Sequence, residues 1–140
     1  MDDCLLKPQM PAGEYIVEFD HYYTTTMFRE STPKVVMVFY IADGDYEGVR
    51  IERFYTVARL YGESERNGRF KPKGQTCRLM MEFCSCFPDQ EIERLDRLPM
   101  SRWLTGRFLV LLRGVTKNHE KEIIPRQLKY SVIERIIRSV

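Results

Sequence analysis

The chain has 140 residues, of which 44% are hydrophobic and 30% are charged, and its formal net charge is +2. This length corresponds to about one domain of roughly 100–200 residues, and the composition excludes a disordered or collagen-like chain. No apolar run approaches the roughly 20 residues of a membrane-spanning helix, and the four cysteines lack the spacing of a disulfide framework. We therefore expect a cytoplasmic domain that does not associate with membranes.

Two strands are predicted after an extended N-terminal lead-in over residues 1–12. The alternation of apolar and polar side chains over Glu14–Tyr23 predicts a half-buried strand. The apolar, β-branched and aromatic run Lys34–Ile41 predicts a second strand with little exposure, and Tyr40 within it is interpreted as a core residue. Between the strands, the polar segment Thr24–Pro33 predicts a loop longer than an ordinary hairpin connection.

A third strand is predicted over Val49–Val57, after an Asp-Gly turn. Its alternation directs Tyr55 toward the core and directs Arg50 and Phe54 outward. Arg53 falls among the inward positions and is the odd member of that set.

A basic segment, a helix and two further strands follow. Residues 61–74 carry three glycines among charged residues, which predicts a flexible basic loop. Helical spacing over Gln75–Phe87 predicts a helix whose apolar face consists of Cys77, Met80, Met81, Cys84 and Phe87. A short second helix is expected over Glu91–Leu98, before Pro99. Gly106–Val115 and Lys129–Ile137 predict the last two strands, with a polar loop between them.

Five strands with a helix between the third and the fourth follow the element order of the OB-fold, a small Greek-key barrel. We therefore predict an all-β fold with one or two helices, in which residues 13–140 form a single five-stranded OB-fold domain. Barrel closure removes most exposed strand edges, and the helix would cover the open end. Another α+β fold with five strands and one helix is the alternative.

Three short patterns in strands and turns carry a family resemblance. Gly13-Glu14-Tyr15 opens the first strand, Gly44-Asp45-Tyr46-Glu47-Gly48 precedes the third, and Leu104-Thr105-Gly106-Arg107 leads into the fourth. Together they resemble phage and mobile-element single-stranded-DNA-binding proteins of the OB-fold class, over roughly residues 11–137. The resemblance implies single-stranded DNA as the partner and a homodimer or higher homo-oligomer.

Basic residues are concentrated in two blocks of the sequence. Residues 50–78 hold eight Lys or Arg against three Asp or Glu, and residues 101–140 hold nine against three. Binding a single strand without reading its sequence requires cations for the phosphates and exposed aromatic faces for the bases. The blocks fit such a polyanion site, and an ordinary solvated surface is their alternative interpretation.

The candidate site combines cations and aromatic residues from the expected binding face. The cations expected to contact phosphates are Arg50, Arg53, Arg59, Arg69, Lys71 and Lys73. The aromatic residues expected to carry bases are Phe54, Tyr22 and Tyr61. Loop cations expected to contribute are Arg29, in the first long loop, and Lys117 and Lys121, between the last two strands. For Arg50 the alternative is an ion pair with Glu52.

We predict non-catalytic, largely sequence-independent binding of single-stranded DNA, with RNA left open, in phage or mobile-element DNA metabolism. No cofactor or metal is expected, because Cys77, Cys84 and Cys86 lack the spacing of zinc ligands. No catalytic motif occurs, so an enzyme is not expected, although a nuclease using Asp43 and Asp45 is one alternative. The main alternative is a protein-interaction module on the same fold, acting as an adaptor or an inhibitor.

Overall fold

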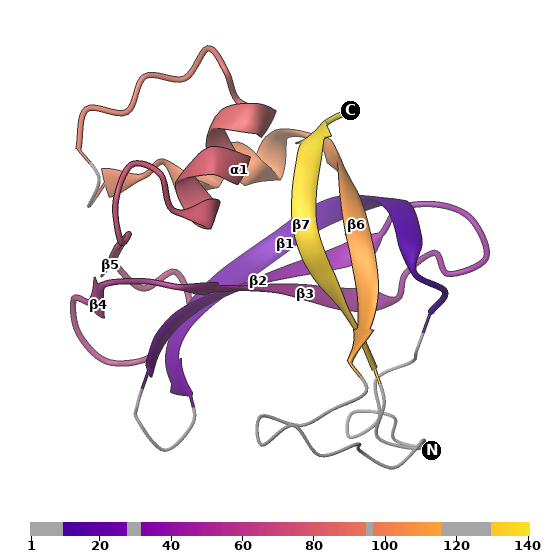
Figure 1. The fold of residues 1–140 in the computed structure, drawn as a ribbon, viewed down its shortest axis with the longest axis horizontal. Coiled ribbons are helices and arrows are strands. Elements are labelled where there is room, and N and C mark those ends of the chain that lie inside the picture. Colours follow the sequence, from indigo (N-terminus) through magenta and orange to yellow (C-terminus); the bar gives the residue numbers. More distant parts are fainter. Residues whose placement is uncertain (1–9, 28–31, 95–96, 116–129) are drawn as a thin grey trace.

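The computed structural model describes residues 10–27, 32–94, 97–115 and 130–140 (Figure 1). Within these residues, the chain forms a five-stranded antiparallel sheet, a two-stranded hairpin, one α-helix and one 3-10 helix. The elements in chain order are β1 (Gly13–Met27), β2 (Thr32–Ile41), β3 (Arg50–Thr56), β4 (Arg59–Leu60), β5 (Phe70–Lys71), α1 (Arg78–Cys86), η2 (Met100–Thr105), β6 (Arg107–Val115) and β7 (Tyr130–Ser139). The predicted mostly-β chain with a helix between the third and fourth long strands is confirmed.

The five long strands form one curved sheet in the order β3-β2-β1-β6-β7. The long strand β1 pairs with β6 over Gly13–Glu18 and with β2 over Val17–Met27, so it changes partner partway along its length. A bulge between Phe19 and His21 lies just beyond this change of partner. Bulges bend a strand and increase its twist. β1 therefore arcs across the molecule and curls the sheet around its core (Figure 1).

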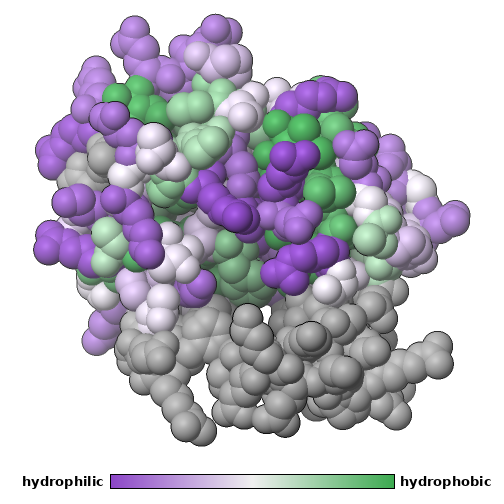
Figure 2. Space-filling view, viewed as in Figure 1, coloured by the Kyte–Doolittle hydropathy of each residue, from purple (hydrophilic) through white to green (hydrophobic). Residues whose placement is uncertain are grey.

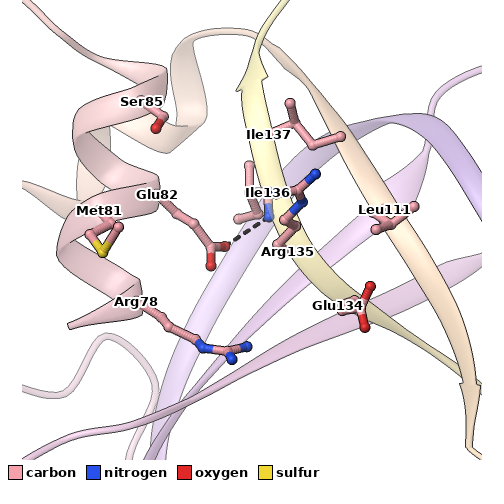
Figure 3. Close-up of a pocket in the computed structure, with 9 residues that line it drawn as sticks. All are labelled: Arg78, Met81, Glu82, Ser85, Leu111, Glu134, Arg135, Ile136 and Ile137. Carbon is pink, nitrogen blue, oxygen red and sulfur yellow. Dashed lines mark hydrogen bonds between the residues drawn. The ribbon is translucent and has the colours of Figure 1, made fainter. Parts of the chain in front are cut away.

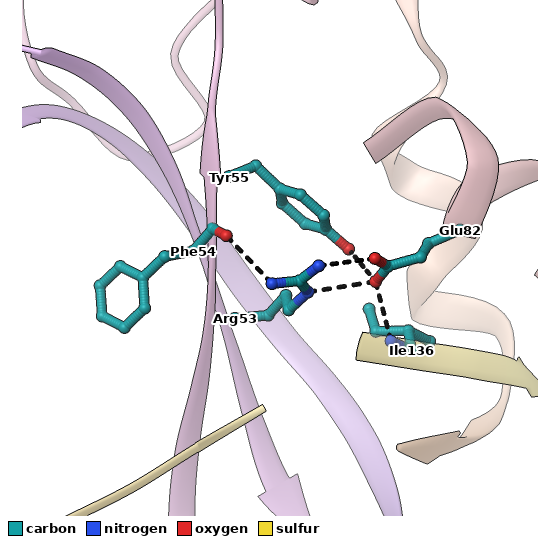
Figure 4. Close-up of polar contacts among 5 residues, drawn as sticks. All are labelled: Arg53, Phe54, Tyr55, Glu82 and Ile136. Carbon is teal, nitrogen blue, oxygen red and sulfur yellow. Dashed lines mark hydrogen bonds and ion pairs between the residues drawn. The ribbon is translucent and has the colours of Figure 1, made fainter. Parts of the chain in front are cut away.

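The sheet is open, because its edge strands β3 and β7 share no ladder within the described residues. At this seam the Glu82 carboxylate of α1 binds groups from both edges (Figure 4). From β3 it accepts hydrogen bonds at 2.6 and 3.1 Å from the Arg53 guanidinium and at 2.8 Å from the Tyr55 hydroxyl. From β7 it accepts the backbone N–H of Ile136 at 2.8 Å. One buried carboxylate thus connects the two edges, and closure into a barrel stays a prediction.

An aromatic cluster fills the core between the sheet and the helical segments. Trp103, from η2, is fully buried, and its ring lies 5.0 Å from the rings of Phe87 and Phe108 and 5.8 Å from that of Phe83. The Phe39 ring of β2 meets the same tryptophan edge-on at 6.5 Å. Such edge-to-face pairs stabilise a core beyond the burial of their apolar area. The cluster therefore fixes α1 and η2 on the inner face of the sheet.

The predicted helix is present, and its predicted buried face is correct in part: Met80 and Phe87 are buried and Cys77 packs against the core, but two members of that face are not buried. Met81 is 58% exposed and Cys84 is also exposed, whereas Leu79 and Phe83 are buried. The buried face of the helix is shifted from the predicted one because the Glu82 side chain points inward to the β3–β7 seam. Apolar periodicity alone assigns a carboxylate to the solvent side and therefore places Met81 and Cys84 in the core.

Three other differences concern element boundaries. β1 extends to Met27, into the predicted loop, because its last residues pair with the start of β2. Short strands β4 and β5 pair where a flexible loop was expected. Of the short helix predicted over Glu91–Leu98, residues 91–94 are not helical and Arg97 has 3-10 conformation, while the 3-10 helix η2 lies further on, at Met100–Thr105.

Candidate nucleic-acid interface

The β4–β5 hairpin directs its apolar side chains to the core and its basic side chains to solvent. Leu60 and Phe70 are register partners that pack against the core. The neighbouring pair, Arg59 and Lys71, is exposed on the opposite face. The next pair continues the ladder, because the Tyr61 N–H donates to the Arg69 carbonyl at 2.9 Å. Strand alternation therefore gathers three cations and one tyrosine on one outward face.

Tyr61 organises the two arginines of this face. The guanidinium carbons of Arg59 and Arg69 lie 4.7 and 5.5 Å from the centroid of the Tyr61 ring. Cation–π contact at such distances restrains long side chains that would otherwise sample many rotamers. The structure places the Tyr61 ring against the two arginines, and the expectation that Tyr61 carries a base stays a prediction.

The basic surface continues from the hairpin to the start of β2. Lys73 is exposed and follows Lys71 by two residues. Burial lowers the pKa of Lys34, and the positive charge of nearby Lys73 lowers it further. The Lys34 ammonium also donates to the Thr56 hydroxyl of β3 at 2.6 Å. We name this row of five cations the basic strip: Lys34, Lys73, Lys71, Arg59 and Arg69.

No carboxylate of the described residues is paired with the exposed cations of the basic strip. Within the part of the chain that the structure describes, Arg59, Arg69, Lys71 and Lys73 form no ion pair. Other arginines do, as Arg107 illustrates by contacting Glu18 at 2.9 Å. Hydrophilic side chains accordingly dominate the left margin of Figure 2, where β4 and β5 lie in Figure 1. The basic strip is therefore positively charged surface that an external anion could neutralise.

The outer face of β1, β2 and β3 carries a second group of predicted residues. Phe54 is half-buried and lies opposite Val36, which in turn lies opposite Tyr23. Val36 is fully buried although it is not part of the main core, so these neighbouring side chains cover it. One register step away, Lys34 pairs with Thr56. Phe54 therefore lies next to one end of the basic strip.

Arg50 belongs to this outer face but is paired. Its guanidinium lies 3.4 Å from the carboxylate of Glu52, which also accepts the Tyr23 hydroxyl at 3.4 Å. The alternative prediction of an Arg50–Glu52 pair is thus confirmed. The Arg50 side chain is still 48% exposed, so a phosphate could reach it only in competition with Glu52.

The prediction that Arg53 contacts phosphate is wrong, because this side chain is buried at the β3–β7 seam and bound to Glu82 (Figure 4). Tyr22 lies on the inner side of β1, not on its outer face. Its hydroxyl donates to the Gly68 carbonyl at 3.1 Å, and its ring meets Phe70 edge-on at 6.0 Å. Burial raises the pKa of Tyr22. Arg29, Lys117 and Lys121 lie outside the described residues.

Two surface residues near the site were missed from the sequence. Lys34 was taken only as the start of a strand, and Tyr40 was interpreted as core, although Tyr40 is 37% exposed. The missing signal was the register: Lys34, Val36, Val38 and Tyr40 share one face of β2, and their β3 partners include Arg50 and Phe54. Had β2 been read by alternation with the polar face of β3, both residues would have been placed outward.

The described residues show no grouping of three His, Cys, Asp or Glu side chains that could hold a metal ion. Among the same residues, no helix is long and apolar enough to cross a membrane. Cys86 is buried, and burial, followed by the Glu82 charge, raises the pKa of its thiol to about 12. Comparison with known proteins adds no identification, because no family model, curated protein or solved structure matches this chain.

Proposed function

We propose that this chain is a non-catalytic, OB-fold-type domain that binds single-stranded DNA with little sequence preference. The proposal is supported mainly by the basic strip, whose exposed cations have no carboxylate partner among the described residues. A charged surface of one sign attracts a polyanion and is neutralised by it. The predicted barrel, the family resemblance and possible self-association belong to the same proposal.

In the proposed complex, phosphates of the strand lie along the basic strip. Arg59 and Arg69 are restrained by Tyr61, so they would lose little side-chain freedom when they bind. Bases would stack on Phe54 at one end of the strip, where β3 presents its half-exposed ring. Stacking is tolerant of base identity and contributes about 1–3 kcal/mol per base, which accounts for binding without sequence readout.

Fluorescence anisotropy of a labelled oligothymidine of about 30 nucleotides tests the proposal. The protein is titrated at low salt, with unlabelled duplex and RNA of the same length as competitors. We expect binding that the duplex does not displace and that the double variant Arg59→Ala, Lys71→Ala weakens. The matched control is Arg135→Ala, Arg138→Ala, which removes two exposed cations from β7. Absence of binding at low salt, or equal weakening by both double variants, would overturn the proposal.

A protein-interaction module is the second candidate, and a groove between α1 and β7 favours it (Figure 3). The groove has a volume of about 610 Å³, and its walls include the exposed Met81 of α1 and Leu111 and Ile137 from the sheet. Figure 2 shows apolar surface over α1 and over β6 and β7, with hydrophilic side chains between them. Exposed apolar surface of this kind is common at protein interfaces. A chain that fails to bind oligothymidine would direct the search to this groove.

A further inference from the structure

Two adjacent cavities lie where the β4–β5 hairpin meets β1 and the segment around η2. The smaller, of about 220 Å³, is lined by Tyr22, Arg69, Phe70, Arg97 and Leu98. The larger, of about 420 Å³, shares Tyr22 and Leu98 with it. The larger cavity falls within the range of about 300–1,000 Å³ typical of small-molecule sites. The two cavities therefore adjoin at Tyr22 and Leu98 beside the hairpin, and we call them together the recess.

Charge differs between the two cavities, because the described lining of the larger one includes the carboxylate of Asp20 as well as Arg66 and His21. Among the described residues, the smaller one is lined by two arginines and by no carboxylate, an arrangement that favours an anion. Arg69 is also the last cation of the basic strip. A strand that follows the basic strip is thus led directly to the mouth of this recess.

The larger cavity has the chemistry of a site for a nucleobase. Phe19, Met100 and the shared Tyr22 provide flat or apolar walls, and Asn67 and Ser101 bring hydrogen-bonding groups to its edge. Leu104, which also lines it, is 61% exposed, so a large apolar side chain stands uncovered at this site. A base presents the matching combination of apolar faces and a polar edge.

Tyr22 is already fixed in the position that such a ligand requires. Its hydroxyl is held by the Gly68 carbonyl, and Phe70 supports its ring from the side. The hairpin turn that supplies Gly68 is itself bound to β1, through the Thr24 N–H to the Glu65 carbonyl at 2.9 Å and the Asn67 N–H to the Tyr22 carbonyl at 3.0 Å. A rigid wall binds a planar ligand with a smaller loss of conformational entropy.

We propose that this recess binds one nucleotide of the strand, with its phosphate between Arg69 and Arg97 and its base in the larger cavity against Tyr22. The inference rests on the proposed function and deepens it, because it assigns one base to a pocket instead of an open stacking face. An internal nucleotide and a terminal nucleotide carry the same phosphate and base, so the chemistry of the recess suits either one.

Blocking the larger cavity tests this inference. Ser101 is exposed and lines the cavity, so Ser101→Trp can fill it without disturbing the core. The matched control is Ser85→Trp, which adds the same side chain at an exposed serine of α1, outside the recess. Each protein is titrated with oligothymidine and with an abasic deoxyribose-phosphate chain of equal length. We expect Ser101→Trp to weaken oligothymidine binding by about 5-fold or more, the loss of one stacked base, and to leave binding of the abasic chain unchanged. Ser85→Trp should match the unmodified protein on both chains.

The outcomes separate the inference from the proposed function. If the unmodified protein binds oligothymidine and Ser101→Trp binds it equally well, the pocket is refuted and the proposed function stands. If the unmodified protein binds neither chain, both are refuted. A circular oligothymidine, which has no ends, then shows which nucleotide the recess binds. If the nucleotide is internal, Ser101→Trp weakens binding of both the circle and the linear strand. If it is terminal, Ser101→Trp weakens binding of the linear strand only.

Discussion

Replacing Glu82 by glutamine should destabilise the fold strongly, because this carboxylate joins α1 to both edges of the sheet. Glu82→Gln preserves the shape of the side chain but removes its charge and presents an amide N–H₂ to groups that are all donors: the Arg53 guanidinium, the Tyr55 hydroxyl and the Ile136 N–H. Arg53 would then be a buried cation without a counter-charge. Breaking a buried ion pair from one side costs about 3–5 kcal/mol.

Urea and thermal unfolding, followed by the fluorescence of the buried Trp103, measure this loss. For a chain of this size, the expected loss of free energy of unfolding lowers Tm by about 10–15 °C. The exposed Glu91 provides the matched control, and Glu91→Gln should change stability by no more than about 0.5 kcal/mol. A loss below about 1 kcal/mol for Glu82→Gln would refute the assignment of Glu82 as the connection across the seam.

A double variant tests the same reasoning from the other side. Arg53→Met with Glu82→Leu removes both charges and leaves apolar side chains of similar length at the seam. Apolar replacements of buried ion pairs are often nearly neutral, so the double variant should lose less stability than the sum of the two single losses. Stability equal to the sum of the two single losses would show that the two side chains act independently.

Buried and exposed side chains elsewhere give three further tests. Trp103 is the one tryptophan of the chain and is fully buried, so iodide should quench its fluorescence weakly until the protein unfolds; strong quenching of the folded protein would contradict this burial. At pH 8 a thiol reagent should modify the exposed Cys84 in the folded protein but modify Cys86, whose pKa burial raises to about 12, only after denaturation, as mass spectrometry of peptides would show. Gly68→Ala should destabilise the fold by about 1–3 kcal/mol in urea, because the added Cβ would overlap the Thr24 side chain, whereas Gly74→Ala, which meets open space, should not.

Strand periodicity predicted most of the architecture. The alternation over Glu14–Tyr23 and Val49–Val57 and the apolar run Lys34–Ile41 correspond to strands that pair in sequence order. The turn after the second strand was also recognisable, because Gly44 has φ of 83°, a conformation that glycine adopts readily. Strands and turns of this kind can be predicted because residues close together in the sequence determine them.

Long-range pairing explains what the sequence could not predict. Arg53 is buried because Glu82, 29 residues away, neutralises it, and nothing near Arg53 indicates that partner. The same contact rotates α1 and exposes Met81. β4 and β5 are two residues long and lie far apart in the loop, so their pairing depends on the docking of Leu60 and Phe70 against the core. The sequence therefore predicted which types of residue form the candidate site, but not which of those residues lie next to one another.

The dependence of oligothymidine affinity on salt concentration tests the central claim most directly. The four exposed cations of the basic strip predict that log affinity falls with log salt with a slope of about −2.8, at about −0.7 per phosphate of a single strand. The Arg59→Ala, Lys71→Ala variant should flatten this slope by about 1.4, and the Arg135→Ala, Arg138→Ala variant should leave it unchanged. A slope near zero for the unmodified protein, or the same slope for the unmodified protein and both variants, would contradict binding through the basic strip.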